Sequence, residues 1–275
     1  MKTETSMKAE KRKKHGAKPG AGEKYDHGRK PDITFFFPAY NEEKNLPKLI
    51  KDAKDILEEV AGKWEILIVL YAGSTDRSAE IVESLHKKDS RIRLVMQPKD
   101  EKGVGWGIKL GFDAARYEHI FYADSDNQFY LRELKNFLPY IHDYDVIAGY
   151  RINRQDPWLR ILTSRVYNTL IRLLFRTKER DVDCAFRYVN KKLFRKVKLI
   201  CRLGLATSEL LVKARRSGFR IREVGVTHLP RYAGASVFEG EGLPLPRLSV
   251  VMDLFREMRV LWKDIHGREN INSSR

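Results

Sequence analysis

The sequence predicts an α/β protein whose central, mostly parallel sheet is covered by helices on both faces. Three observations lead to this fold class. Short apolar runs of strand length alternate with segments of helical periodicity between residues 31 and 150. The apolar runs are continuous rather than alternating, as in parallel strands buried on both faces. Polar motifs follow four of these runs, where ligands of such sheets bind.

The elements follow one another in a regular order. Strands are expected at 33–40, 64–71, 91–97, 119–124 and 145–150, and helices at 41–60, 74–88, 105–116 and 131–141. Apolar residues recur on one face of the first helix: Leu46, Leu49, Ile50, Ala53, Leu57 and Val60. Asn41 and Ser74 are expected to cap the first two helices, because their side chains can accept backbone N–H groups there.

The composition divides the chain into three parts. Residues 1–30 are polar, charged and interrupted by Gly and Pro, which predicts a disordered basic tail. Residues 31–240 form one domain, and residues 241–275 an amphipathic helical extension. No apolar segment follows the basic N-terminus, so no signal peptide is expected. No run approaches the roughly 18 apolar residues of a membrane-spanning helix.

The charge points to phosphate-bearing partners. The net charge is +16; the first 30 residues carry ten Lys and Arg against four Asp and Glu, which leaves +10 for the rest. Such a surface attracts nucleic acid, anionic lipid or a phosphorylated small molecule. No nucleic-acid-binding module is present, so no specific nucleic acid is expected. The two cysteines, Cys184 and Cys201, cannot form a disulfide framework and fit a reducing compartment.

The stretch "FYADSDNQ" carries the strongest chemical signal. Asp124 and Asp126 lie one residue apart where an apolar strand ends, and Gln128 follows. Carboxylate and amide oxygens suit a hard divalent cation. A capped turn of Asp, Ser and Asn is the alternative, and would be common on its own.

Further motifs occur at the ends of the other strands. They are "FPAYNEE" (37–43), "GSTDRS" (73–78), "GYR" (149–151), "DVDCAFR" (181–187), "SELLVKARRSGFRIREVGV" (208–226) and "RYAGAS" (231–236). With "DSDNQ" (124–128), this set resembles the family 2 glycosyltransferases, which have the GT-A fold. It is most similar to the dolichol-phosphate mannose synthase branch and its bacterial polyprenyl-phosphate relatives. The resemblance covers about residues 32–238.

The resemblance implies a metal-dependent hexosyltransferase. Such an enzyme moves a sugar, with inversion, from a nucleotide-diphosphate sugar to a polyprenyl (dolichyl-type) phosphate. Asp124, Asp126 and Gln128 would lie near Mg²⁺ or Mn²⁺ and the diphosphate. A cation there neutralises the charge that builds on the leaving group.

The nucleotide end of the site follows from the same resemblance. Pro38, Tyr40 and Glu42 would contact the base and ribose. Relatives usually carry two acids before "GS", where this chain has Tyr71 and Ala72. A tyrosine can stack on a base but offers no carboxylate to a base N–H. The base therefore stays open, and a non-catalytic nucleotide- or membrane-binding relative is one alternative.

The acceptor end leaves two chemistries open. Arg151 and Arg231 are candidates to clamp phosphates, because Arg presents a planar fork of donors. Asp183 lies near the acceptor end by resemblance, and Glu209 near the position where relatives with sugar acceptors keep a base. A sugar hydroxyl needs such a base, whereas a lipid phosphate is already an anion.

The segment 151–180 predicts contact with a membrane surface. It carries eight Arg and Lys against two acids, and its expected helix 157–176 is basic and amphipathic. The alternative is a helix packed on the sheet with its arginines outward. Peripheral association of a cytoplasmic enzyme is expected, through this helix, through 248–265 or through an integral membrane partner.

Overall fold

The computed structural model describes residues 30–152, 154–233, 239–240 and 243–272. Its main sheet has seven strands in the order β3-β2-β1-β4-β6-β5-β7. The strands are β1 (Ile33–Ala39), β2 (Trp64–Tyr71), β3 (Ile92–Gln97), β4 (His119–Tyr122), β5 (Val146–Ile152), β6 (Arg187–Asn190) and β7 (Ile221–Thr227). Only β6 runs antiparallel to its neighbours. The predicted α/β class with a mostly parallel sheet is confirmed.

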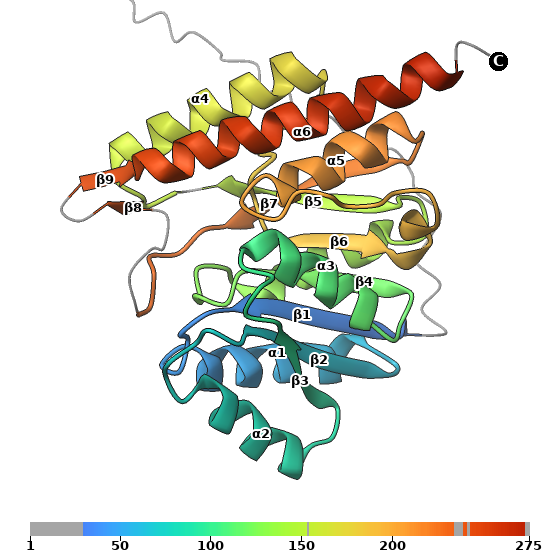
Figure 1. Ribbon diagram of the computed structural model, residues 1–275. Coiled ribbons are helices and arrows are strands. Elements are labelled where there is room, and N and C mark those ends of the chain that lie inside the picture. Colours follow the sequence, from blue (N-terminus) through green and yellow to red (C-terminus); the bar gives the residue numbers. More distant parts are fainter. Residues whose placement is uncertain (1–29, 153, 234–238, 241–242, 273–275) are drawn as a thin grey trace, which may run out of the picture.

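Six α-helices accompany the sheet in the described residues (Figure 1). They are α1 (Leu46–Val60), α2 (Ser78–Lys88), α3 (Val104–Ala114), α4 (Trp158–Phe175), α5 (Ala206–Arg216) and α6 (Leu248–Asn272). A small hairpin, β8 (Glu239–Gly240) and β9 (Leu243–Pro246), precedes α6. The helix α6 passes close to the end of α4, where the rings of Phe175 and Trp262 lie 6.3 Å apart.

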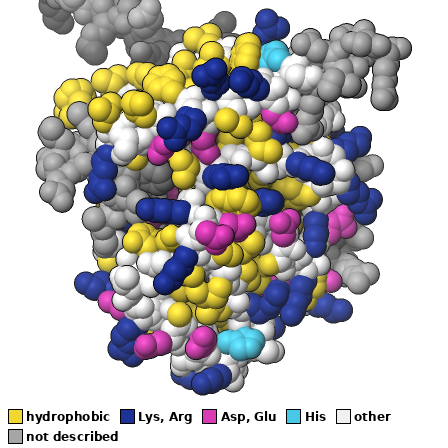
Figure 2. All heavy atoms as spheres, viewed as in Figure 1, with side chains coloured by type: hydrophobic (Ala, Val, Ile, Leu, Met, Phe, Trp, Pro, Cys, Tyr) yellow, Lys and Arg dark blue, Asp and Glu magenta, His cyan; other side chains and the backbone are white. Residues whose placement is uncertain are grey.

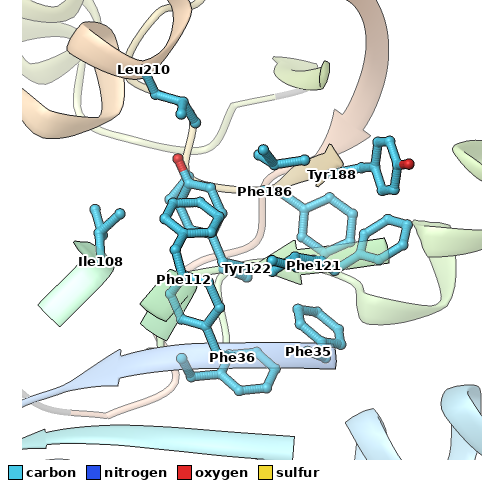
Figure 3. Close-up of a cluster of buried hydrophobic side chains, with 14 of the residues drawn as sticks. Phe35, Phe36, Ile108, Phe112, Phe121, Tyr122, Phe186, Tyr188 and Leu210 are labelled. Carbon is cyan, nitrogen blue, oxygen red and sulfur yellow. The ribbon is translucent and has the colours of Figure 1, made fainter. Parts of the chain in front are cut away.

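The core is rich in aromatic side chains from the central strands. Figure 3 shows Phe36, Phe112 and Tyr122 grouped together, and the ring centroids of Phe36 and Tyr122 lie 5.3 Å apart. Gly111 makes this packing possible, because a Cβ there would lie 2.3 Å from the Phe36 ring. Substituting Gly111 would push α3 off the sheet. The closely packed core fixes the strand ends, and with them the loops that form the site.

Three local predictions were wrong. The helix α1 begins at Leu46 rather than at Asn41, and α2 begins at Ser78 rather than after Ser74. Residues 131–141 form two short 3₁₀ helices, η1 (Leu131–Asn136) and η2 (Leu138–Tyr140), instead of an α-helix. Pro139 lacks the N–H that a continuing α-helix would need, which favours the shorter turns.

The loops before α1 and α2 differ from the prediction because they bind each other. Asn41 has a φ of 54° and its side-chain oxygen accepts the N–H of Thr75. Ser74 accepts the N–H of Asn41 at 3.3 Å, and Asp76 accepts the N–H of Glu43 at 2.9 Å. The expected capping side chains therefore join two neighbouring strand ends rather than start helices.

The outer parts of the chain are only partly described. The predicted basic tail lies outside the described residues, apart from Lys30. Within the proposed C-terminal extension, α6 spans Leu248–Asn272. Within the part of the chain that the structure describes, no helix has the combination of length and apolarity that crossing a bilayer requires.

Candidate active site

The candidate site lies along the C-terminal edge of the sheet. The strands β1, β2, β4 and β5 point the same way, so the loops after Ala39, Tyr71, Tyr122 and Ile152 open at one edge. This edge is where parallel sheets bind ligands, because the loops after several strands converge there.

The acidic loop after β4 is fixed by hydrogen bonds to three other segments. Ser125 donates to the carbonyl oxygen of Pro38 at 2.9 Å, and Asn127 donates to that of Asn45 at 3.1 Å. The side-chain amide of Gln128 donates to the carbonyl oxygen of Leu229 at 3.1 Å. Residues 125–128 are buried, whereas Asp124 is exposed. The loop therefore holds Asp124 open to solvent from a rigid base.

Asp126 is already paired within the loop. Its Oδ1 accepts the N–H of Gln128 at 3.1 Å, and its Oδ2 lies 2.8 Å from Nη2 of Arg231. Arg231 is itself partly buried, with a side chain 24% exposed. Sequence-predicted Asp126 and Arg231 are thus brought together, beside Asp124.

A third carboxylate, that of Asp183, lies close to Asp124 and Asp126. Asp183 is close enough that its charge, with that of Asp126, raises the pKa of Asp124. The main cause of the rise, to a pKa of about 7, is the protein atoms that crowd around the Asp124 carboxylate, although the residue keeps an exposed surface at the edge of the site. Withdrawal from water also raises the pKa of Asp183. The site therefore concentrates negative charge that Arg151 and Arg231 offset only in part.

These carboxylates suit a hard divalent cation. Within the described residues, Asp124 accepts no hydrogen bond and forms no ion pair, so its oxygens are available. A cation would also relieve the repulsion among Asp124, Asp126 and Asp183. In the part of the chain that the structure describes, no three His, Cys, Asp or Glu side chains already form a metal-binding group. Metal binding by Asp124, Asp126 and Gln128 therefore stays a prediction.

Arg151 is placed beside the site but is engaged. Its Nε and Nη2 atoms bind the two oxygens of Asp181 at 2.7 and 2.8 Å, and Nη2 lies 3.3 Å from Asp183. Its side chain is 8% exposed. Asp181 was not singled out from the sequence, although its spacing from Asp183 repeats the D-x-D pattern of Asp124 and Asp126. To bind a phosphate, the Arg151 guanidinium would have to share its donors between that phosphate and Asp181.

A fully buried arginine lies behind the carboxylates. Arg187 is 0% exposed, and its guanidinium donates to the carbonyl oxygens of Thr207 and Val182. Its positive charge opposes the raised pKa of Asp183. No sequence pattern indicates this role, because Arg187 stands out only as the end of "DVDCAFR".

Two tyrosines mark the other end of the site. Tyr40 follows β1 and Tyr71 ends β2, and their ring centroids lie 5.7 Å apart. The hydroxyl of Tyr71 donates to the carbonyl oxygen of Lys99 at 3.0 Å, and its ring lies against Gly73. Tyr40 is 42% exposed. The pair presents a fixed ring beside an accessible one, an arrangement that can hold a flat base.

Glu42 and Pro38 connect this end to the acidic loop. Burial raises the pKa of Glu42, and a hydrogen bond from the Asn45 side chain opposes that rise. Pro38 provides the carbonyl oxygen to which Ser125 binds. Both predicted residues therefore lie next to the carboxylate cluster, and their contacts with a nucleotide stay a prediction.

Glu209 is not brought into the open part of the site. Its side chain is 0% exposed, and its two oxygens accept the N–H groups of Ile200 and Cys201 at 2.8 Å each. Lys213 lies 2.5 Å from the same carboxylate. These contacts are those of a buried residue that fixes a loop, and they do not favour a role as a base.

Comparison with known proteins agrees with this arrangement. A model of the glycosyl transferase family 2 matches residues 34–198. The chain is 30% identical over 210 residues to "Glycosyltransferase AglD" of Haloferax volcanii, covering 73% of this chain and 33% of the relative. It is 27% identical over 208 residues to "Undecaprenyl-phosphate 4-deoxy-4-formamido-L-arabinose transferase" of Pectobacterium atrosepticum, covering 75% and 62%. The chain thus spans one third to three fifths of these relatives.

Solved structures share the fold. Glucosyl-3-phosphoglycerate synthase from Mycobacterium tuberculosis, in complex with Mn²⁺, UDP and glucosyl-3-phosphoglycerate, superposes with a TM-score of 0.58 at 14% identity. The match covers 74% of this chain and 73% of that one. The same enzyme with phosphoglyceric acid gives a TM-score of 0.59 at 15% identity, covering 85% and 79%. At these identities the likeness concerns the GT-A fold alone.

Proposed function

Because the chain belongs to glycosyl transferase family 2, we propose that it transfers a sugar from a nucleotide-diphosphate sugar to a polyprenyl phosphate at a membrane surface. The observation that carries this proposal is the group of Asp124, Asp126 and Asp183 at the open edge of the sheet, with Arg151 and Arg231 beside it. Anionic and cationic groups meet there as a diphosphate and its cation would require.

Different residues would bind the base and the diphosphate of the donor. Tyr40 and Tyr71 hold the base, and Glu42 lies between them and the acidic loop. Asp124 and Asp126, with Gln128, would hold Mg²⁺ or Mn²⁺, which supplies positive charge to the departing diphosphate. Arg231, which pairs with Asp126, would bind a phosphate oxygen of the donor if a cation held Asp126.

The bond changes are those of a single displacement. An oxygen of the acceptor phosphate attacks the anomeric carbon, and the bond from that carbon to the nucleoside diphosphate breaks as the new bond forms. Attack from the opposite side inverts the configuration. The acceptor oxygen is already anionic, so positioning and charge stabilisation suffice without a general base. The burial of Glu209 agrees with this acceptor better than with a sugar hydroxyl.

The acceptor class is supported by a relative and by the surface. The name of the Pectobacterium relative specifies undecaprenyl phosphate. On α4, five large apolar residues are exposed: Trp158, Leu162, Val166, Leu173 and Leu174. On α6, exposed apolar residues recur with helical spacing: Leu248, Met252, Phe255 and Trp262. Figure 2 shows apolar and basic side chains together over this region. Such a surface suits peripheral contact with an anionic membrane.

The function is tested by sugar transfer itself. Purified protein is incubated with Mn²⁺, a panel of labelled nucleotide sugars, and vesicles that contain undecaprenyl phosphate or the uncharged alcohol undecaprenol. We expect label in the lipid fraction only with the phosphate, and only when Mn²⁺ or Mg²⁺ is present. Transfer to undecaprenol instead would indicate a hydroxyl acceptor, and no transfer from any donor despite donor binding would indicate a non-catalytic relative.

Because Tyr71 stands where relatives usually have an acid, we expect the site to discriminate poorly between nucleotide bases. Wild-type protein should bind UDP and CDP with similar affinity, because no side-chain carboxylate reads the ring N–H that uracil has and cytosine lacks. Tyr71→Asp should raise the ratio of UDP to CDP affinity by about tenfold, the value of a hydrogen bond to a charged group. Calorimetric titration of both nucleotides measures the ratio.

The matched control for this prediction is Tyr71→Phe. It removes the hydrogen bond to Lys99 without adding a charge, so the UDP to CDP ratio should stay at the wild-type value. An unchanged ratio in Tyr71→Asp would show that Tyr71 does not lie at the base.

A further inference from the structure

A cavity of about 290 Å³ lies where α4 and α5 end against α6. It is lined by Leu174, Arg176, Arg216, Trp262 and His266. None of these residues belongs to the carboxylate loop or to the tyrosine pair, so the reaction proposed above does not use this cavity. Its volume is at the small end of ligand pockets, which run from roughly 300 Å³ upward. It therefore suits a headgroup-sized ligand better than a whole nucleotide sugar.

One wall of the cavity is aromatic and held in place. The rings of Trp262 and His266 stack with centroids 3.8 Å apart and an interplanar angle of 26°. The Nδ1 atom of His266 lies 2.9 Å from the carbonyl oxygen of Trp262, and the ring of Phe175 lies 6.3 Å from that of Trp262. Trp262 is still 43% exposed. The wall is thus preformed and accessible.

The other wall is cationic. Arg176 follows α4 with a φ of 54°, which ends the helix there and turns the chain. Within the described residues Arg176 forms no hydrogen bond or ion pair, and Arg216 comes from the last turn of α5. Arg216 has a partner of its own within the fold, and none of the residues that line the cavity is acidic. The charge that faces the cavity is therefore positive.

Helix-end arginines often do no more than offset the helix dipole. That role needs neither a cavity nor an aromatic wall between two arginines from different helices. Guanidinium groups that converge on a cavity are the usual partners of phosphate oxygens, because their donors form a planar fork. The combination with Trp262 and His266 indicates a ligand that carries a phosphate ester.

The cavity borders the exposed apolar residues at the end of α4. Leu174 lines it, and the adjacent Leu173 is 74% exposed. We propose that Arg176, Arg216, Trp262 and His266 form a second, non-catalytic site that binds the phosphate of an anionic lipid headgroup. This proposal rests on the membrane contact of α4 and α6 described under the proposed function. The same chemistry would accept a free phosphate, so the test separates the two sources.

The experiment compares double variants in vesicle co-sedimentation. Arg176→Gln with Arg216→Gln removes two charges from the cavity, and Arg256→Gln with Arg259→Gln removes two exposed charges of α6 outside it. Both lose the general attraction to an anionic surface. On vesicles that contain phosphatidylglycerol, the cavity variant should bind about tenfold more weakly than the control, because only it loses a fork of directed hydrogen bonds. On phosphatidylcholine alone, the two should bind alike.

A third variant and a soluble probe make each outcome decisive. Leu162→Glu with Val166→Glu should abolish binding to both vesicle types. If this variant binds as well as the wild type, α4 does not contact the membrane. Inorganic phosphate should raise the melting temperature of the wild type and not that of the cavity variant. If only this phosphate effect appears, the site binds a soluble phosphate instead of a lipid. Equal behaviour of the two arginine doubles in both assays would overturn the proposal.

The acceptor phosphate itself provides the last comparison. With detergent-dispersed polyprenyl phosphate, the cavity variant should keep the wild-type KM for the acceptor. A rise of KM by tenfold or more would assign the cavity to the acceptor, and so would overturn its description as a second site.

Discussion

Asp124→Asn should reduce sugar transfer at least about 10³-fold, since it removes the one carboxylate of the acidic loop that is open to solvent and unpaired in the described residues. The amide keeps the shape of the side chain but carries no charge, so the affinity for Mn²⁺ in the presence of donor should fall with the rate. Initial rates at saturating donor, and calorimetric titration with Mn²⁺ and UDP, measure the two effects. Asp113→Asn, on the exposed side of α3, is the matched control.

The same variant should not be less stable than the wild type when metal is absent. The folded-state pKa of Asp124 is raised from its ordinary 3.8 to about 7, so ionising this group disfavours folding. The penalty is absent below pH 3.8, grows as the pH rises toward 7, and is complete above 7. Asparagine cannot ionise, so thermal melts at pH 8 in chelator should show Asp124→Asn at or above the wild-type melting temperature. A large drop would mean that lost activity reflects unfolding.

The fold was predictable because its first strands are mostly apolar. The run "WEILIVLY" has the length of a buried strand and is short for a helix, and β2 spans Trp64–Tyr71 as expected. The apolar face of α1 was predictable for a similar reason, because Leu46, Leu49, Ile50 and Ala53 repeat with helical spacing and are all buried. The antiparallel strand β6 was not predicted, since its four residues "RYVN" carry too little pattern to indicate a strand.

The candidate site was predictable only where its residues are close in the sequence. Asp124 and Asp126 stand out because they are one residue apart at a strand end. The pairing of Arg151 with Asp181 joins residues 30 positions apart, and no local pattern indicates it. The same holds for Asn41 and Thr75, which bind across two loops. Capping rules consider one helix at a time, and here a neighbouring loop competes successfully for the same side chains.

Glu209→Gln should lower stability and leave the rate per folded molecule within about threefold of the wild type. The carboxylate accepts two backbone N–H groups and lies beside Lys213, and glutamine can satisfy only part of this set. A general base would behave differently, since its loss costs about 10²–10⁴-fold in rate and removes one limb of the pH profile. Urea unfolding, kcat and the pH dependence of kcat/KM distinguish the two roles.

Lys213→Met provides the sharper stability test, because it leaves Glu209 charged, 0% exposed and without its cationic partner. Breaking a buried ion pair from one side costs about 3–5 kcal/mol of unfolding free energy. Glu209→Gln combined with Lys213→Met removes both charges, and should recover part of that loss. If the double variant is stable and transfers sugar to the lipid phosphate, Glu209 holds the loop at Ile200 and Cys201 and takes no proton from the acceptor. If it is stable and inactive, while donor binding is unchanged, the hydroxyl-acceptor mechanism returns with Glu209 as its base.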